Sequence, residues 1–272
     1  MRFNDKTVLI TGASLGVGRA VAKAFIREGA NVALCARRED VLAEAVRALG
    51  APDRVLAIPC DVVDLRAMEM LVAETCTRFG AIHGLVNNAG AHARGPVLGR
   101  DPSQLAAMVD VNLRAPIVLT RLVLPHIERA GGGFVVNIAS LAGKLPLDGA
   151  ATYSSTKFGL RAFSYAMAEE LRGRGITVSA VSPGPIDTGF IMDEIDEVED
   201  IVFSQSMCTA EDVARMTLDC AADGRVEREF PVAGGKLATL AYLVPGLRRL
   251  LKPALARKGA QAKARLKAER SS

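Results

Sequence analysis

Short apolar runs that alternate with helical patterns are the feature that most limits how this chain can fold. They recur from residue 6 to about residue 232, and most are apolar throughout, as in parallel strands buried on both faces. The stretches between them are long enough for helical crossovers, which are right-handed in nearly all sheets. The strands expected are Thr7–Thr11, Val32–Ala36, Val55–Cys60, Gly84–Asn87, Gly133–Ala139, Ile176–Ser182 and Val226–Val232.

This alternation predicts an α/β fold with a doubly wound, mostly parallel, seven-stranded sheet of the Rossmann type in a single domain. Half of the 272 residues are hydrophobic, which suffices for a large core. We assign residues 1–235 to the catalytic domain and residues 236–272 to a carboxyl-terminal extension. The main helices expected are Gly18–Glu28, Val41–Leu49, Leu65–Phe79, Pro102–Arg129 and Thr152–Arg172.

Residues 187–209 break the alternation. They follow a strand end and contain the acidic run 193–200. Four apolar residues recur there at helical spacing with the acids on the opposite face, namely Ile191, Ile195, Val198 and Val202. The pattern predicts an amphipathic helix, either a mobile lid over the carboxyl edge of the sheet or an ordinary surface helix.

The extension at 236–272 joins an apolar stripe to a basic run. The stripe is interrupted at Pro245-Gly246 and consists of Leu237, Leu240, Val244 and Leu247. Residues 247–272 carry nine Lys and Arg against one acid, so the rest of the chain has a net charge of −4 although the whole has +4. A mildly acidic body does not indicate a nucleic-acid-binding domain. The extension either lies on an anionic membrane surface, packs on the subunit, or is a solvated tail.

The cysteines and histidines indicate whether to expect disulfides or a metal site. The five cysteines are scattered and none forms a CxxC pair, so neither a disulfide scaffold nor a zinc site is expected. The three histidines, at 83, 92 and 126, lack metal-ligand spacing, so no metal is implied. We expect no signal peptide and no membrane-spanning stretch, and therefore a cytoplasmic protein that at most touches a membrane surface.

A glycine-rich loop joins the first strand to the first helix. Its glycines, Gly12, Gly16 and Gly18, are spaced GxxxGxG. Such glycines allow a sharp exit from the strand, a close approach of pyrophosphate to the backbone, and tight packing of helix on strand. The helix N-terminus then presents free N–H groups to the phosphates. The residues expected to bind the cofactor here are Gly12, Ser14, Leu15, Gly16, Val17 and Gly18.

The end of the second strand bears on cofactor preference. An acid there would bind the ribose 2′-hydroxyl of NAD, but the sequence reads Ala36-Arg37-Arg38. Two guanidinium groups suit a 2′-phosphate, so NADP(H) is favoured, with NAD(H) as the alternative. After the third strand, Asp61, with Val62 beside it, either accepts from the adenine amino group or caps the next helix.

Ser140, Tyr153 and Lys157 form a Ser-x12-Tyr-x3-Lys array. Tyr153 and Lys157 are four residues apart on a helix and share one face. A phenol normally titrates near ~10, and a neighbouring ammonium lowers that pKa. The tyrosine can then exchange a proton with an alcohol or carbonyl oxygen, while the serine hydrogen-bonds the same oxygen.

Taken together, these motifs resemble the short-chain dehydrogenase/reductase family. The resemblance covers residues 5–190 well and 190–232 loosely. The residues that carry it are Thr11 to Gly18, Asn87 to Gly90, Asn112, Ser140, Tyr153, Lys157 and Pro183 to Thr188. It implies a nicotinamide dinucleotide cofactor, Tyr153 as general acid/base, Ser140 as the partner of the substrate oxygen, and Lys157 on the nicotinamide ribose.

The resemblance also implies roles for the remaining motif residues. Asn87 would stabilise the central sheet, and the cofactor would be lined on its adenosine side by Asn88, Ala89 and Gly90. Asn112 would help to form a proton relay that links Lys157 to solvent. Alternatively, it is a helix cap or a buried amide with a structural role. The nicotinamide would be covered by Pro183, Gly184, Ile186 and Thr188, although Thr188 also suits a turn.

The function expected is therefore NADP(H)-dependent interconversion of a ketone or aldehyde and an alcohol. The alternatives are an NAD-preferring dehydrogenase and a non-catalytic dinucleotide sensor or scaffold. A hydrophobic carbonyl or alcohol is favoured by the residues expected to line or rim the pocket, His92, Arg94, Leu145, Leu147, Phe190 and Met192. A homo-oligomer is expected, and the extension puts the family's usual tetramer in doubt against a dimer through the helices at 102–129 and 152–172.

Overall fold

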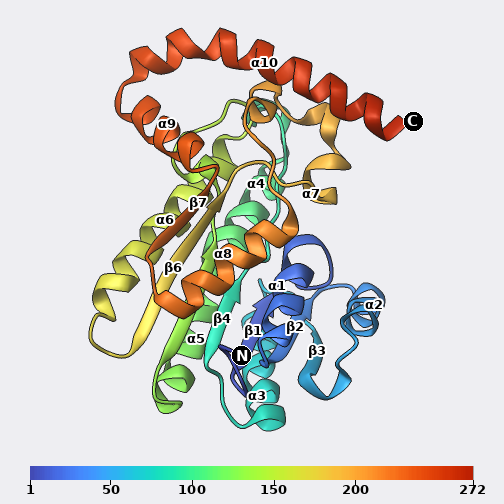
Figure 1. The fold of residues 1–272 in the computed structure, drawn as a ribbon, viewed down its shortest axis with the longest axis vertical. Coiled ribbons are helices and arrows are strands. Elements are labelled where there is room, and N and C mark those ends of the chain that lie inside the picture. Colours follow the sequence, from blue (N-terminus) through green and yellow to red (C-terminus); the bar gives the residue numbers. More distant parts are fainter. Residues whose placement is uncertain (272) are drawn as a thin grey trace.

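The computed structural model describes residues 1–271, excluding the side chains of Arg248, Arg270 and Ser271. Its seven strands form one sheet in the order β3-β2-β1-β4-β5-β6-β7, and every neighbouring pair is parallel (Figure 1). The α/β fold class is thus confirmed. The strands are β1 (Thr7–Thr11), β2 (Asn31–Ala36), β3 (Val55–Pro59), β4 (Gly84–Asn87), β5 (Gly133–Ile138), β6 (Ile176–Pro183) and β7 (Glu227–Phe230).

Helices cover both faces of the sheet. One apolar cluster joins the strands to α1, α2 and α8, and a second joins them to α3, α5 and the end of α6. The central strands β1 and β4 are buried throughout, as the continuous apolar runs predict. These helices are α1 (Gly16–Arg27), α2 (Glu39–Leu49), α3 (Leu65–Phe79), α5 (Ala115–Arg129), α6 (Ala151–Glu170) and α8 (Ala210–Asp223).

The strand order reverses between β1 and β4, which opens a crevice at the carboxyl ends of these strands. The loops on either side of the crevice are tied together. Asn88, after β4, donates its amide to the carbonyl oxygens of Thr11 (2.9 Å) and Gly12 (3.0 Å). A Cβ at Gly18 would collide with the Gly12 carbonyl and this amide, so only glycine lets α1 pack so closely.

The long helix predicted over Pro102–Arg129 is interrupted. It consists of α4 (Pro102–Val109), a π-helical turn, η3 (Asp110–Arg114), and then α5. Pro116, near the start of α5, has no N–H to donate to the carbonyl of Asn112, four residues earlier, so the regular pattern cannot continue through this turn. The interruption coincides with a predicted site residue, Asn112.

The single amphipathic helix predicted within 187–209 is wrong. The segment instead forms α7 (Gly189–Met192) and two short 3-10 turns, η5 (Ile195–Glu197) and η6 (Asp200–Ser204). Its acids pair with cations of the loop after β4 and of the carboxyl-terminal helix, and its apolar residues gather in a small cluster of their own. These tertiary contacts override the helical pattern. The fully buried members of the cluster are Ile191, Met192, Val198 and Phe203.

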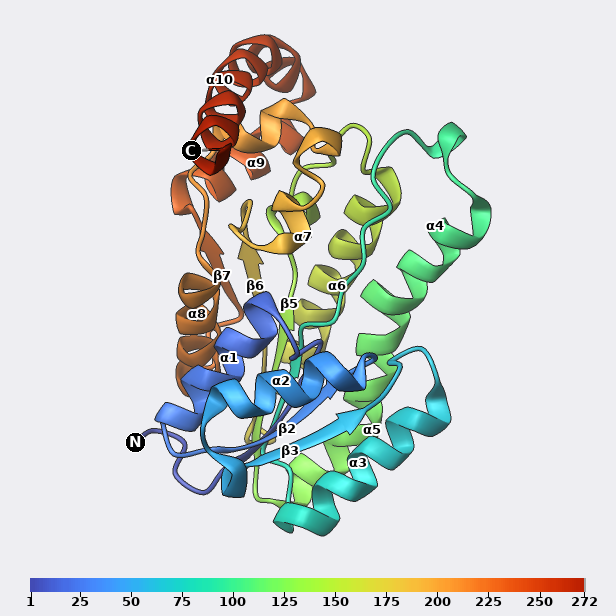
Figure 2. The same ribbon diagram turned by 90° about the vertical axis from the view of Figure 1, so that its right-hand side faces the viewer.

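The chain after β7 is helical. The predicted strand Val226–Val232 is shorter in the structure, because Pro231 is the N-cap of α9 (Val232–Leu243) and the helix follows β7 at once. The next helix, α10 (Pro245–Ser271), crosses the end of the molecule at the carboxyl edge of the sheet (Figures 1 and 2). Within the described part of the chain, no helix is long and apolar enough to cross a membrane.

Candidate active site

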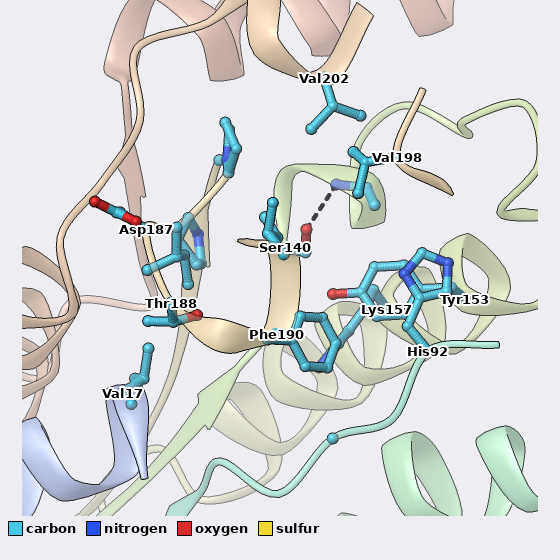
Figure 3. Close-up of a pocket in the computed structure, with 18 of the residues that line it drawn as sticks. Val17, His92, Ser140, Tyr153, Lys157, Asp187, Thr188, Phe190, Val198 and Val202 are labelled. Carbon is cyan, nitrogen blue, oxygen red and sulfur yellow. Dashed lines mark hydrogen bonds between the residues drawn. The ribbon is translucent and has the colours of Figure 1, made fainter. Parts of the chain in front are cut away.

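A cavity of about 1600 Å³ opens at the carboxyl edge of the sheet. It is lined by most of the residues that the sequence singles out: Gly12, Ser14 to Gly18, Arg37, Asn88 to Gly90, Ser140, Tyr153, Lys157, Pro183, Gly184, Ile186 and Thr188. Arg38, Asp61, Val62 and Asn112 are not part of this lining. Figure 3 shows Val17 and Thr188 on one side of the cavity and Val198 and Val202 on the other, with Ser140 between them.

The glycine-rich loop forms an anion cradle. Gly12 and Gly16 have positive φ angles of 63° and 50°, which glycine adopts without strain. No side chain caps the start of α1 at Leu15, so its first N–H groups stay available to a ligand. The free helix N-terminus and the absent side chains fit the pyrophosphate of a dinucleotide.

Of the residues expected to bind the adenosine end of the cofactor, only Arg37 lines the cavity; Arg38 and Asp61 do not. Arg37 is exposed and lines the cavity, whereas Arg38 precedes α2 outside the lining. The carboxylate of Asp61 accepts from the backbone N–H of Val63 (3.1 Å), and the N-cap of α3 is Asp64. Asp61 therefore closes a local turn rather than capping the helix.

Ser140, Tyr153 and Lys157 converge on the floor of the cavity. Ser140 follows β5 and caps the turn η4 (Leu141–Gly143) by accepting from the N–H of Ala142 (3.1 Å), and it hydrogen-bonds the Tyr153 hydroxyl. The Lys157 ammonium donates to the carbonyl of Ile138 (2.8 Å) and lies 5.8 Å from the centre of the Tyr153 ring. The three groups thus come together from a strand end and one helix face, as their spacing predicts.

Burial dominates the titration of these groups. It raises the pKa of Tyr153 above its ordinary value, although the Ser140 hydrogen bond and the Arg94 charge act in the opposite direction. The net shift is opposite to the lowering expected from Lys157. Burial also lowers the pKa of Lys157 to about 8. At neutral pH the pair is therefore a protonated phenol beside an ammonium, a state suited to donating a proton.

His92 lies against Tyr153, and Arg94 lies against His92. The His92 ring stacks on the Tyr153 ring with centroids 4.1 Å apart. Arg94 donates to Nδ1 of His92 (2.9 Å), and because arginine only donates, Nδ1 accepts and the neutral ring carries its hydrogen on Nε2. Burial lowers the pKa of His92 to about 3, so the ring stays neutral.

Arg94 also holds the segment that covers the cavity. Its side chain is only 7% exposed. It donates to the carboxylate of Glu194 (2.8 Å) and to the backbone carbonyl of Phe190, both in the 187–209 segment. These hydrogen bonds attach the loop after β4 to this segment directly beside Tyr153.

Asn112 is fully buried and bridges two elements. Its Oδ1 accepts from the backbone N–H of Ala91 (2.8 Å), and its Nδ2 donates to the backbone carbonyl of Ala91 (2.8 Å). The same Nδ2 also donates to the hydroxyl of Thr156 on α6 (3.2 Å). It makes no direct bond to Lys157. The observed contacts match the alternative reading of a buried amide, one that fixes the loop after β4 against the helix carrying Tyr153.

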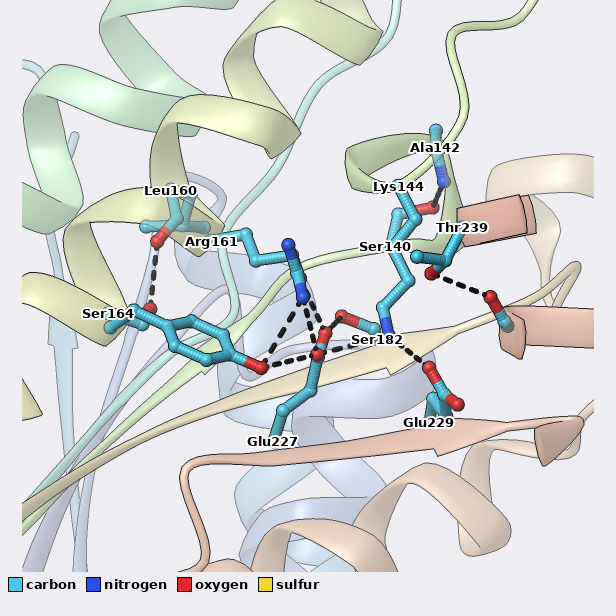
Figure 4. Close-up of polar contacts among 12 residues, drawn as sticks. Ser140, Ala142, Lys144, Leu160, Arg161, Ser164, Ser182, Glu227, Glu229 and Thr239 are labelled. Carbon is cyan, nitrogen blue, oxygen red and sulfur yellow. Dashed lines mark hydrogen bonds and ion pairs between the residues drawn. The ribbon is translucent and has the colours of Figure 1, made fainter. Parts of the chain in front are cut away.

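A buried ionic cluster that the sequence did not reveal supports the same helix (Figure 4). The carboxylate of Glu227 on β7 accepts from Arg161 (2.9 Å), Tyr165 (2.8 Å) and Ser182 (2.7 Å), and pairs with Lys144 at 3.0 Å. These partners hold the pKa of Glu227 at about 2 despite its burial. Lys144 also pairs with Glu229 and lies just after the Ser140 turn, so the cluster braces α6 and the serine loop together. Glu227 carries no signal of this role in the sequence, because alternating Glu and Arg is equally typical of a solvent-exposed strand.

The sequence of this chain is similar to those of known proteins. The family model for short chain dehydrogenase matches residues 6–199. Ketoacyl reductase HetN of Nostoc sp. is 38% identical over 193 residues, which are 70% of this chain and 67% of that protein. Sulfoacetaldehyde reductase 2 of Chromohalobacter salexigens is 36% identical over 187 residues (68% and 74%), and mouse L-fucose dehydrogenase is 35% identical over 189 residues (69% and 67%). The helices α8, α9 and α10 lie beyond the residues that the family model matches.

Proposed function

The chain belongs to the short-chain dehydrogenase/reductase family of oxidoreductases, and on this basis we propose that it interconverts a ketone or aldehyde and an alcohol with NADP(H). The family implies a nicotinamide cofactor and chemistry at a carbonyl or alcohol carbon. One observation carries the finer proposal: Ser140, Tyr153 and Lys157 line the same cavity as the glycine cradle.

The cofactor-binding residues fit a dinucleotide phosphate. The N–H groups at the start of α1 would bind the pyrophosphate, and the Arg37 guanidinium would pair with a 2′-phosphate. Pro183, Ile186 and Thr188 would cover the nicotinamide. When bound, the cofactor supplies or accepts the hydride.

The chain's own residues orient the substrate oxygen and move its proton. Ser140 hydrogen-bonds the carbonyl oxygen and Tyr153, protonated at neutral pH, donates to it as the alcohol forms. In the oxidative direction Tyr153 takes the proton back. Lys157 holds positive charge beside the tyrosine and would bind the ribose hydroxyls, and Asn112 keeps the helix in register with the loop after β4.

A spectrophotometric screen tests this proposal. NADPH oxidation is followed with a panel of ketones and aldehydes, and NADPH binding is measured separately by calorimetry. Turnover of at least one carbonyl supports the proposal. Tight NADPH binding with no turnover across the panel would favour the non-catalytic sensor instead.

Cofactor preference is tested with two matched variants. Arg37→Ala removes the cation that lines the cavity, and Arg38→Ala removes its neighbour outside the lining. A lost charge-assisted bond to phosphate weakens NADPH binding by about tenfold or more. We expect this only for Arg37→Ala, with NADH binding unchanged. Tighter binding of NADH than NADPH by the unaltered protein would overturn the NADP assignment.

We further propose that residues 187–209 act as a lid. The support is their place over Ser140 and Tyr153 and their attachment through Arg94. A closed lid excludes water from the reacting oxygen. We also propose a reducing, cytosolic location, because the five cysteines are scattered along the sequence and none forms a CxxC pair.

A homodimer is proposed through α5 and α6. These helices leave Ile117 and Tyr165 at least 38% exposed on the outer surface. Sedimentation velocity tests this: a dimer is expected for the whole protein and a monomer for Ile117→Glu. A monomeric unaltered protein would contradict it.

Membrane-surface contact is proposed at the turn between α9 and α10. Leu243 and Leu250 are at least 70% exposed there, and Arg249 and Lys252 flank them. Apolar residues among cations suit an anionic bilayer surface. Sedimentation with phosphatidylserine vesicles is expected to pull down the protein and to fail with Leu243→Glu/Leu250→Glu; equal behaviour would contradict the proposal.

A further inference from the structure

The cavity extends well beyond the glycine cradle and Tyr153, and its far wall is built by the carboxyl-terminal extension. The wall residues come from one face of α9 and one face of α10: Leu237, Ala238, Ala241, Leu251, Leu255 and Ala256. The face of α9 is tightly packed, since Ala238 and Ala241 are at most 5% exposed. The extension is therefore part of the active site rather than a free tail.

The wall is anchored to the lid and to the loop after β5. Lys263 of α10 donates to the carbonyl of Val198 (2.7 Å) and pairs with Asp200 (3.2 Å), and Lys267 pairs with Asp196. A Cβ at Gly259 would collide with the Asp200 carbonyl, so the two backbones touch. Ala262 and Leu266 pack against the apolar cluster of the lid.

Apolar surface predominates in the lining of the cavity, to which polar side chains such as Gln205 and Glu199 also contribute. Besides the wall itself, Leu145, Leu147 and Val202 line the cavity. The total volume of about 1600 Å³ exceeds the ~300–1,000 Å³ of an ordinary single-ligand pocket, so a second ligand has room beside a dinucleotide.

Charge at this end of the cavity disfavours an anionic substrate. Among the described side chains that line it away from the cradle, the cations are already engaged. Arg94 pairs with Glu194, Lys252 pairs with Asp148, and the ammonium of Lys157 belongs to the reacting centre. The acids Asp193 and Glu199 add negative charge to the same lining.

We propose that α9 and α10 form a specificity wall that binds the apolar chain of an uncharged, elongated ketone or secondary alcohol. This inference deepens the proposed oxidoreductase function and rests on it. The reacting oxygen lies at Ser140 and Tyr153, and the chain extends toward Leu255 and Ala256. Each methylene buried on this wall adds about fourfold to kcat/KM until the cavity is filled.

The test compares 2-butanone, 2-undecanone and the anionic 10-oxoundecanoate as substrates of the whole protein. We expect kcat/KM to be at least a hundredfold higher for 2-undecanone than for 2-butanone, and lower for 10-oxoundecanoate than for 2-undecanone. Equal values for the two neutral ketones, or preference for the anion, would overturn the wall proposal while leaving the oxidoreductase function intact. No turnover of any carbonyl would instead count against the proposed function.

Two matched variants locate the binding surface without relying on turnover. The chain contains no tryptophan, so A256W and A254W each carry a single reporter indole. Ala256 lines the cavity, whereas Ala254 is exposed two residues away. In the presence of NADP⁺, which does not react with a ketone, 2-undecanone should shift the emission of A256W to the blue and leave that of A254W unchanged.

The same variants give a kinetic contrast. A256W fills part of the cavity, and we expect it to raise KM for 2-undecanone about tenfold while KM for 2-butanone changes by less than twofold. A254W should behave as the unaltered protein in both assays. L255A, which shortens the wall without crowding it, should lower kcat/KM for 2-undecanone only. Equal emission shifts for the two tryptophan variants, or unchanged kinetics in both A256W and L255A, would refute the assignment.

Discussion

Arg94 offers the sharpest test of how the proposed lid is held over Ser140 and Tyr153. The substitution Arg94→Met keeps a long side chain in the same space but removes every donor. It breaks the bonds to Glu194 and to the Phe190 carbonyl, and it takes away the partner of His92. The loop after β4 then has no buried polar link to the lid through this side chain.

The magnitude follows from burial. A hydrogen bond from a buried cation is worth about 1.5–3 kcal/mol, which applies to the bond with the Phe190 carbonyl. Glu194 is 49% exposed, so solvent screens its pairing with Arg94, which contributes at most about 1 kcal/mol. The lid should therefore lose about 3 kcal/mol of closing free energy, which is roughly a hundredfold in the closing equilibrium.

Arg100→Met is the matched control, because Arg100 joins the same two segments through Glu197. That pair is 3.2 Å apart, with side chains 29% and 57% exposed, so its loss should cost less than about 1 kcal/mol. The assay is kcat/KM for a ketone substrate together with cleavage by a Glu-specific protease within the lid. We expect Arg94→Met to lose between tenfold and a hundredfold in kcat/KM and to be cut faster, with NADPH binding retained. Identical behaviour of the two variants would refute this role of Arg94.

Two other predictions concern stability and the cradle. The pKa of Glu227 is about 2 in the folded protein, below its ordinary value of 4.5. The ionised carboxylate therefore adds fully to the free energy of unfolding above pH 4.5, and this stabilisation is lost as the pH falls toward 2. Urea unfolding should show Glu227→Gln to be less stable than the unaltered protein at pH 7 by roughly 3 kcal/mol, a gap that closes at low pH; a gap independent of pH would contradict this. Gly18→Ala should cost about 1–3 kcal/mol and weaken NADPH binding, because the new Cβ meets the Gly12 carbonyl and the Asn88 amide. Calorimetric titration showing unchanged affinity would argue against that packing role.

Most of the sheet, and the convergence of Ser140, Tyr153 and Lys157 on one cavity, were predictable from the sequence. Apolar runs bounded by turn residues gave β1 and β4 to the residue, and α3 likewise, because those elements are set by local pattern and simple burial. Ser140, Tyr153 and Lys157 were found through spacing, since a strand end and one helix face bring them together.

Features set by tertiary contacts were not predictable in the same way. The acidic lid reads as a helix in isolation, yet it is broken by ion pairs to α10 and to the loop after β4. A signal did exist: Asp196 and Asp200 are four residues apart, as are Lys263 and Lys267, their partners. Complementary charge at matching spacing could have brought the extension back onto the lid.

The pKa of Tyr153 shows the limit of spacing arguments. A neighbouring ammonium predicts a lowered pKa, but burial raises the pKa of Tyr153, and the cation that acts against burial is Arg94. The Lys157 ammonium lies toward the ring and bonds the Ile138 carbonyl rather than the phenolic hydroxyl. The sequence spacing shows that Tyr153 and Lys157 share one face of the helix. Only the folded structure shows where the Lys157 ammonium lies relative to the phenolic hydroxyl.

The proton-donating role of Tyr153 is tested most directly by Tyr153→Phe, assayed for ketone reduction and, in parallel, for NADPH binding and thermal unfolding. Removing a general acid typically costs about 10²–10⁴-fold, so we expect kcat to fall by at least a hundredfold while affinity for NADPH and the melting temperature stay unchanged. A variant that binds NADPH normally and still reduces the ketone within tenfold of the unaltered rate would contradict the account.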